Sequence, residues 1–316
     1  MAGRAAMSPL AQVAQEYLAL RRALGHDLAD AARQLPRFVA HLEATGAQTV
    51  TIEAALAWAQ EPDASPASTV WARRMTVARG FARHMAGIDP ATEVPPVGLI
   101  RYRQRWRPPY IYTPADIASL MAQARRSITA PLRAATYETL IGLLAATGLR
   151  VGEAISLDRT DIDWSESLLM VRESKFQKSR LVPVHETTLQ ALERYGRLRD
   201  QHQPRPRDPS FFVSLTAKRL IYQSIFETFR KLCDASGVGA GQAVRPRIHG
   251  LRHTFAVNTL TEWYRDGEDV GARLPWLSTY LGHREPRYTY WYLSAAPELL
   301  ALAAGRLETA SWAVEP

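Results

Sequence analysis

The sequence predicts a mainly α-helical protein that contains one small antiparallel β-sheet, an α+β fold. Apolar residues recur at helical spacing through most of the 316 residues. Residues 161–184 instead hold short apolar runs separated by polar turns, the pattern of strands. A stretch rich in proline and arginine divides the chain, so we expect a helical domain over residues 1–93, a basic linker over 94–111 and the α+β domain over 112–316.

The first domain is expected to be a small, basic helical bundle. Residues 10–44 carry the apolar period of one or two helices, with Gly25 and His26 as a candidate break. Thr51 is placed to cap a helix over residues 52–60. A further helix over residues 68–85 carries several arginines, among them Arg73, Arg74 and Arg79.

The linker holds four arginines and three aromatic residues between two proline pairs. The arginines are Arg101, Arg103, Arg105 and Arg107. One interpretation is a solvated linker whose aromatic side chains pack on the next domain. The other is a strap that follows a phosphate backbone, because guanidinium groups suit phosphate oxygens.

The second domain restarts at Thr113, an N-cap followed by Pro114 at the first helical position and by Asp116 in the first turn. Gly148 should end the apolar helix that precedes it. The expected helices span residues 113–124, 131–147, 151–157, 185–201, 218–236, 250–265, 274–282, 286–293 and 297–307. The expected strands span residues 161–164, 168–171 and 180–184.

Composition narrows the class of protein. No run approaches the ~18 apolar residues of a membrane span, and the N-terminal residues lack the apolar core of a signal peptide. A single cysteine, Cys233, rules out an intrachain disulfide and lies in a helical pattern typical of a buried thiol. We therefore expect a cytoplasmic protein. The net charge of +8 favours a polyanionic partner, although many basic proteins bind no nucleic acid.

Charged residues at three sites suggest chemistry. Arg150 follows a helix end in an apolar stretch, so it either pairs structurally with Glu153 or awaits an anion. His249 and Arg252 lie three apart at a helix start and share a face. Lys175 lies at a hairpin tip, which is solvated by default and is also suited to delivering a proton donor.

A metal site is not expected. His249 and His253 have the spacing of zinc ligands on a helix, but Gly250 stands where zinc proteases carry their glutamate base. Two arginines, a lysine, two histidines and a tyrosine, without a carboxylate pair, instead suit a reaction at a phosphodiester. Arginines grip the nonbridging oxygens, a histidine or lysine protonates the leaving oxygen, and a tyrosine attacks.

Three tyrosines compete for the role of nucleophile: Tyr288, Tyr290 and Tyr292. Helical spacing places Tyr288 and Tyr292 on one face and sets Tyr290 off it. That spacing alone does not separate the first from the last.

The order and spacing of these motifs resemble the tyrosine recombinases of the phage integrase and Xer family. The matching segments are Thr147-Gly-Leu-Arg150-Val-Gly-Glu153, Lys175 before Arg180-Leu-Val-Pro-Val184, His249-Gly-Leu-Arg252-His-Thr-Phe-Ala256, Leu281-Gly-His283 and Tyr292. The offset of nine residues from His283, which only the resemblance supplies, selects Tyr292. The run Tyr290-Trp-Tyr-Leu293 is similar to transposon-borne recombinases, including those encoded in sets of adjacent recombinase genes.

The resemblance implies a role for each matching residue. Arg150 and Arg252 would bind the scissile phosphate, Lys175 would protonate the 5′ hydroxyl, and Tyr292 would form a 3′-phosphotyrosine. His249 would act in proton transfer, and His283 would hydrogen-bond the phosphate or support the nucleophile. Glu153 would orient an arginine.

The resemblance also implies an architecture and partners. A helical core-binding (SAM-like) bundle and a C-terminal catalytic domain would form a C-shaped clamp around double-stranded DNA. Four protomers would act on two sites, alone or with sister recombinases, and no cofactor, metal or ATP is expected. The expected DNA contacts in the linker and first domain are Arg101, Arg103, Arg105, Arg107, Arg73, Arg74 and Arg79.

The sequence leaves alternatives for the C-terminal segment and for the class of activity. The segment 297–307 would dock on a neighbouring protomer or pack on its own domain. The alternatives to a site-specific recombinase are a catalytically silent DNA-binding accessory protein and a type IB topoisomerase.

Overall fold

The computed structural model describes residues 8–26, 28–65, 68–100, 108–174, 178–205, 207–294 and 297–311. The chain divides into two compact units, Met1–Trp106 and Arg107–Pro316. Within those described ranges, every helix is too short or too polar to cross a membrane. The linker residues Arg101, Arg103, Arg105 and Arg107 lie outside the described residues.

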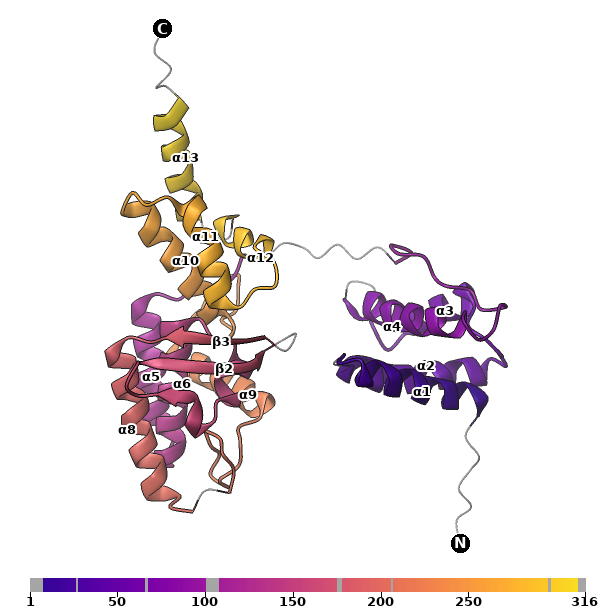
Figure 1. Ribbon diagram of the computed structural model, residues 1–316, viewed down its shortest axis with the longest axis horizontal. Coiled ribbons are helices and arrows are strands. Elements are labelled where there is room, and N and C mark those ends of the chain that lie inside the picture. Colours follow the sequence, from indigo (N-terminus) through magenta and orange to yellow (C-terminus); the bar gives the residue numbers. More distant parts are fainter. Residues whose placement is uncertain are drawn as a thin grey trace. The chain divides into compact units, whose positions relative to one another are not determined.

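The described part of the first unit is a bundle of four helices. They are α1 (Pro9–Ala23), α2 (Ala29–Ala44), α3 (Ile52–Ala59) and α4 (Val70–Met85). Gly25, at φ 78°, follows α1 and supplies the expected break. The Thr51 side chain accepts a hydrogen bond from Ala54 N and caps α3 as expected. Helices α1 and α2 form one layer and α3 and α4 the other (Figure 1). Phe38, Trp58 and Phe81 are buried in the hydrophobic cluster of this bundle.

The second unit begins with a capping box. Thr113 Oγ1 accepts from Asp116 N, and the Asp116 carboxylate accepts from Thr113 N, which fixes the start of the first helix as expected. The main helices are α5 (Pro114–Ser127), α6 (Pro131–Thr147), α8 (Glu186–His202) and α9 (Tyr222–Ser236). They enclose a core that includes Leu140, Phe212 and the thiol of Cys233.

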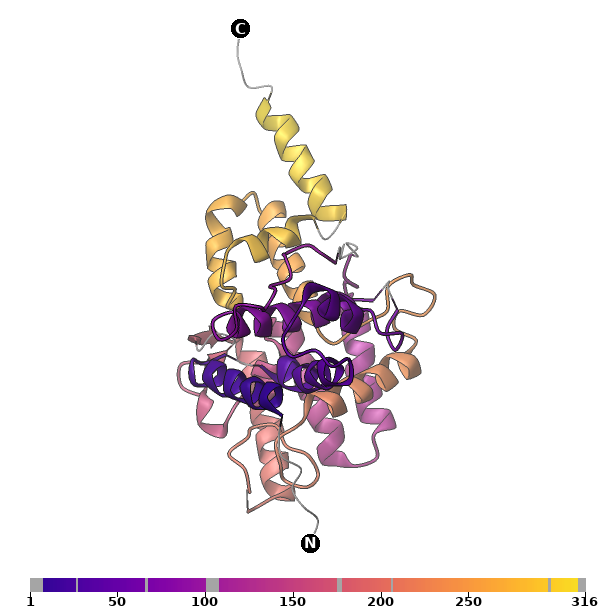
Figure 2. The ribbon, with the colours of Figure 1, turned by 90° about the vertical axis from the view of Figure 1, so that its right-hand side faces the viewer.

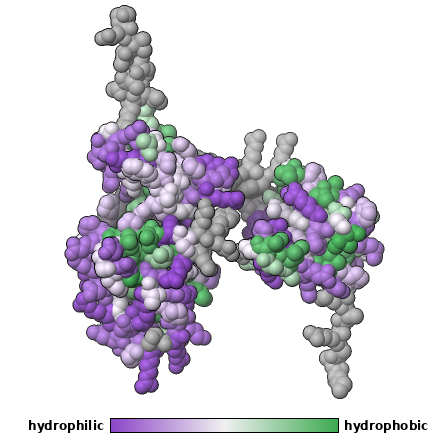
Figure 3. Space-filling model, in the orientation of Figure 1, coloured by the Kyte–Doolittle hydropathy of each residue, from purple (hydrophilic) through white to green (hydrophobic). Residues whose placement is uncertain are grey.

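A three-stranded antiparallel sheet covers this core, so the expected α+β fold is confirmed. Its strands are β1 (Ile162–Asp163), β2 (Leu168–Ser174) and β3 (Lys178–Pro183), in the order β1-β2-β3. Leu169 pairs with Val182, and both side chains point into the core. Met170 pairs with Leu181 on the opposite face, where Figure 3 shows an apolar surface over β2 and β3.

The remaining elements are two short helices beside β2, α7 (Val151–Ser156) and the 3-10 helix η1 (Arg159–Asp161), and a group of helices around another hydrophobic cluster. The group consists of α10 (Gly250–Arg265), α11 (Val270–Leu281), α12 (Arg287–Tyr290), the 3-10 helix η2 (Trp291–Ser294) and α13 (Pro297–Ser311). Leu299 at the start of α13 packs on α10, and the rest of α13 extends away from this unit (Figure 2).

Several expected helices differ from the structure, and three of these differences have a local cause. The helix expected from residue 274 begins at Val270, because Asp269 caps Ala272 N and Pro275 lies inside the helix. The helix expected from residue 218 begins at Tyr222, because Arg219 forms an antiparallel bridge with Val213. The helix expected over residues 286–293 changes from α to 3-10 geometry at Trp291.

Candidate active site

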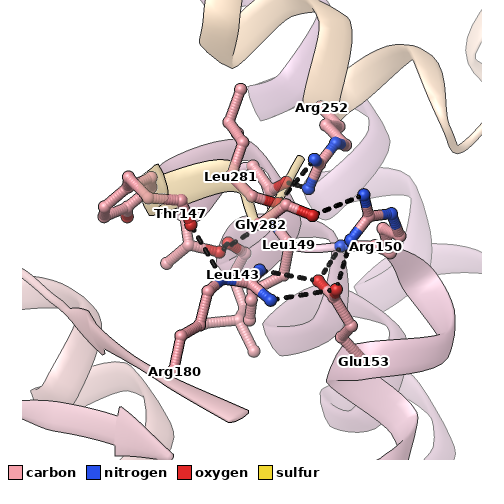
Figure 4. Close-up of polar contacts among 11 residues, drawn as sticks. Leu143, Thr147, Leu149, Arg150, Glu153, Arg180, Arg252, Leu281 and Gly282 are labelled. Carbon is pink, nitrogen blue, oxygen red and sulfur yellow. Dashed lines mark hydrogen bonds and ion pairs between the residues drawn. The ribbon is translucent and has the colours of Figure 1, made fainter. Parts of the chain in front are cut away.

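Two left-handed glycine turns frame the candidate site. Gly148 (φ 61°) ends α6, and Gly282 (φ 67°) ends α11. A Cβ at Gly148 would lie 2.6 Å from Phe255 Cδ1, and one at Gly282 would lie 2.7 Å from Arg180 Nη1. Both positions therefore need glycine, for space as well as for backbone conformation. Figure 4 shows how the two turns approach the arginine side chains.

The side chain of Arg252, a residue of α10, contacts both glycine turns. Its Nη1 donates to Gly148 O at 2.8 Å, and its Nη2 donates to Leu281 O at 2.7 Å (Figure 4). The side chain is only 2% exposed. Burial, followed by the charge of Arg150, lowers the pKa of Arg252 to about 10. The guanidinium is thus a buried cation held by neutral carbonyls, an arrangement that favours a bound anion.

Glu153 joins Arg150 to Arg180. Arg150 Nη1 lies 2.6 Å from Glu153 Oε1, and Arg150 Nη2 donates to Gly282 O at 3.1 Å. Arg180 Nη2 donates to Glu153 Oε2 at 2.9 Å (Figure 4). Burial alone would raise the pKa of Glu153, but hydrogen bonds and charge from Arg180, with Arg150, hold it below its usual value. The structural Arg150–Glu153 pair is present, and Arg150 remains half-buried at the site.

Arg180 was expected only as a strand residue. Its Nε also donates to Tyr280 O at 2.8 Å, so it ties β3 to the end of α11. Its strand register carries the signal that the sequence analysis did not use. Arg180 pairs with the buried Val171 and lies two residues before the buried Val182, so its side chain is on the strand face that points toward the core.

The three tyrosines occupy different environments. Tyr292 is 3% exposed, whereas Tyr288 and Tyr290 are 50% and 52% exposed. The rings of Tyr288 and Tyr292 both lie near that of His283, at centroid distances of 6.4 and 6.0 Å, so burial is what separates the two. Burial raises the pKa of Tyr292, while the charge and a hydrogen bond of Arg252 oppose that rise. Tyr292 is therefore the tyrosine that meets the buried arginine.

His283 lies between the glycine turn and the tyrosine. Its ring stacks on Tyr292, with centroids 6.0 Å apart and planes inclined by 18°. Its Nδ1 lies 2.7 Å from the hydroxyl of Thr289, a residue that the sequence analysis did not single out. Burial and the neighbouring arginines, Arg252 foremost, lower the pKa of His283 to about 3. The ring is neutral at physiological pH.

His249 stands at the N-terminus of α10, one turn before Arg252. Removal from water lowers its pKa, and the charges of Arg252 and Arg150 lower it further. The ring of His253 contacts His249 at 4.8 Å and Tyr292 at 5.6 Å between centroids. The structure therefore brings five of the six expected catalytic residues together. The sixth, Lys175, lies outside the described residues, between β2 and β3.

The arginines expected to contact DNA in the first unit differ in position. Arg74 is 2% exposed, and its Nη2 lies 2.6 Å from Asp63 Oδ2. The geometry does not support the expected DNA contact of Arg74, because its guanidinium is committed to an internal ion pair. Arg79 donates to Pro95 O and Pro96 O at 2.8 and 3.0 Å. Arg73 is exposed and pairs with Asp30.

This fold and site define a tyrosine recombinase. Residues 111–298 match the model described as the phage integrase family, and the chain belongs to that family. It is 42% identical to the putative integrase/recombinase y4rB of Sinorhizobium fredii over 308 residues, which cover 96% of this chain and 98% of the relative.

More distant relatives agree with that assignment. The tyrosine recombinase XerD of Bradyrhizobium diazoefficiens is 28% identical over 300 residues, covering 88% of this chain and 82% of the relative. A Tn1549 transposon integrase, solved with a circular intermediate DNA, has a TM-score of 0.66 at 18% identity, covering 95% of this chain and 99% of that one. This last likeness shows the shared fold. The chain is a site-specific recombinase of the tyrosine type.

Proposed function

We propose that the chain cleaves and rejoins double-stranded DNA through a 3′-phosphotyrosine on Tyr292. The observation that carries this proposal is the burial of Tyr292 against Arg252 within one chain. Arg252 is held by two backbone carbonyls and retains guanidinium N–H groups for an anion. A phosphate that accepts from Arg252 and Arg150 would lie beside the tyrosine oxygen, so the nucleophile acts on the phosphate bound by its own protomer.

The proposed step replaces the phosphodiester bond of the DNA with one to tyrosine. The Tyr292 oxygen attacks phosphorus, the bond from phosphorus to the 5′ oxygen breaks, and the 3′ end stays attached through the tyrosine. His249 accepts the phenolic proton, and Lys175 protonates the leaving 5′ oxygen. Arg150 and Arg252 stabilise the charge of the pentavalent transition state. Because the covalent bond stores the energy of the broken linkage, a 5′ hydroxyl can reverse the step without ATP or metal.

The proposed partners follow from the relatives and from the charge. The Tn1549 integrase was solved in complex with a circular intermediate DNA, and this chain carries a net charge of +8. We propose that the linker arginines, with Arg73 and Arg79, contact the backbone of duplex DNA. Four protomers, alone or with sister recombinases, would join two sites of a mobile element in the cytoplasm, and α13 would dock on a neighbouring protomer.

Trapping of the covalent intermediate tests this function. The substrates are duplexes made from the two ends of the element that carries the gene, each nicked close to the expected cleavage point. Cleavage then releases a short fragment that carries the 5′ hydroxyl, and its loss prevents religation. Wild-type protein should give a denaturation-resistant protein–DNA adduct, and Tyr292→Phe should bind the same duplexes without an adduct. Tyr288→Phe is the matched control and should retain cleavage. An adduct that survives Tyr292→Phe refutes the proposal.

The same reagents separate recombination from its alternatives. A recombinase should exchange strands between two sites, whereas a topoisomerase would relax supercoiled plasmid that lacks the site. A silent accessory protein would give no adduct with any duplex.

A further inference from the structure

Thr289 is a buried polar residue next to the proposed active site. It lies in α12, three residues before Tyr292, and its side chain is 0% exposed. Its backbone N donates to Pro286 O at 2.7 Å. Its hydroxyl lies 2.7 Å from His283 Nδ1. The short helix that precedes the tyrosine is thus joined to His283 by one hydrogen bond.

The direction of this hydrogen bond follows from the environment of the hydroxyl. His283 Nδ1 is the partner that the structure gives to Thr289 Oγ1 in the described part of the chain. If Nδ1 carried a proton and donated, the hydroxyl proton of Thr289 would be buried without an acceptor, which is unfavourable. If Nδ1 is unprotonated, the hydroxyl donates to it and both atoms are satisfied. A neutral imidazole then carries its proton on Nε2.

We propose that Thr289 is a positioning residue that fixes His283 in the Nε2–H tautomer, so that a neutral imidazole donates a hydrogen bond to the scissile phosphate. The contact of Nε2–H with phosphate rests on the proposed function above, whereas the tautomer does not. The neutral form matters because burial, and then the charges of Arg252, Arg150 and Arg180, disfavour an imidazolium at His283. A neutral histidine has a single N–H, so the wrong tautomer would present a lone pair to an anion.

The tautomer can be measured without DNA. Long-range ¹H–¹⁵N correlation spectra of the full chain distinguish the two tautomers, and His283→Gln assigns the signals. Wild type and Thr289→Ser should show His283 as Nε2–H. Thr289→Val, which keeps the shape and removes the donor, should shift His283 toward Nδ1–H. Wild type in the Nδ1–H form, or an unchanged tautomer in Thr289→Val, overturns the proposal.

The rate of covalent complex formation gives the second readout. Thr289→Val should slow cleavage of the nicked duplex by about tenfold at saturating DNA, with unchanged DNA affinity, and Thr289→Ser should restore the rate. Thr259→Val is the matched control, because the Thr259 hydroxyl donates to Phe255 O within α10 and should leave the rate unchanged.

The two readouts separate the inference from the function on which it rests. A shifted tautomer with an undiminished rate would show that His283 does not donate to phosphate, which refutes the catalytic half of the inference. The adduct on Tyr292 would still test the proposed function by itself.

Discussion

Arg180 and Glu153 form a paired hydrogen-bond contact, with Arg180 Nη1 3.1 Å from Glu153 Oε1 and Arg180 Nη2 2.9 Å from Glu153 Oε2. Glu153 accepts from Arg150 in addition. One buried carboxylate is therefore the shared counter-charge of two guanidinium groups, and one of these groups comes from Arg180 in β3.

Loss of the Glu153 carboxylate should destabilise the second unit. Glu153→Ala leaves Arg180 and Arg150 without their shared counter-charge, and the free energy of unfolding should fall by about 3 kcal/mol. Urea unfolding measures this change. Glu193→Ala, which removes the exposed i,i+4 partner of Arg197, is the control and should cost less than about 0.5 kcal/mol. Equal effects from the two variants would contradict the shared-counter-charge description.

The contribution of Glu153 should depend on pH. Its pKa is lowered in the folded state, so its stabilisation is present above the unfolded pKa of about 4.3 and is lost as the pH falls through the folded value. The stability gap between wild type and Glu153→Gln should therefore shrink as the pH is lowered below about 5. Unfolding midpoints across an acid series measure the gap, and a constant gap would argue against a depressed pKa.

Gly282→Ala should damage the site beyond its backbone strain. The new Cβ would meet Arg180 Nη1 at 2.7 Å, at φ 67°. We expect a loss of about 1–2 kcal/mol in stability and at least about tenfold in the cleavage rate. Gly237→Ala is the control, because Gly237 has φ 71° and no atom within 4 Å of the added Cβ. If both variants cleave DNA equally well, displacement of Arg180 does not matter.

Arg252→Lys should abolish cleavage although it keeps the charge. One ammonium group cannot span Gly148 O and Leu281 O while also gripping a phosphate in the bidentate manner of a guanidinium. DNA affinity should change little, since most of the proposed backbone contacts lie elsewhere. Adduct yield and gel-shift titration, measured on the same duplex, check both parts. Normal adduct yield would remove Arg252 from the proposed transition-state contacts.

Arg74 and Arg73 should affect different properties. Arg74→Ala removes a buried side chain together with its ion pair to Asp63, so the free energy of unfolding of the first unit should fall. Arg73→Ala should leave stability nearly unchanged but reduce the steepness with which DNA affinity falls as salt is added. Thermal unfolding and salt-dependent gel shifts check these results. A flatter salt dependence with Arg74→Ala in the folded state would instead restore Arg74 as a DNA contact.

Local signals predicted much of the fold. The N-caps Thr51 and Thr113 and the stop at Gly148 act within a few residues of themselves, so the sequence marks these boundaries directly. The start of α10 at Gly250 was likewise anticipated. The matching motifs also grouped residues that the structure brings together around Arg252 and Tyr292.

The rest depends on contacts that are distant in sequence. Arg180 hydrogen-bonds to Glu153 and to the carbonyl of Tyr280, and both contacts require β3 to pack beside α11. Arg74 has the sequence pattern of an exposed basic helix, but Asp63 in the preceding loop receives its guanidinium. Tyr292 is buried because it packs against residues of α10 and α11, contacts that helical spacing does not anticipate.

The two left-handed turns at Gly148 and Gly282 have a consequence for the energetics of catalysis. Their carbonyls, with that of Leu281, accept hydrogen bonds from Arg150 and Arg252 and orient both guanidinium groups. An incoming phosphate would therefore meet arginines whose rotamers are already fixed, and little conformational entropy would be lost there on binding. We infer that control over strand cleavage lies in how DNA reaches the buried Tyr292 rather than in assembly of the anion-binding groups.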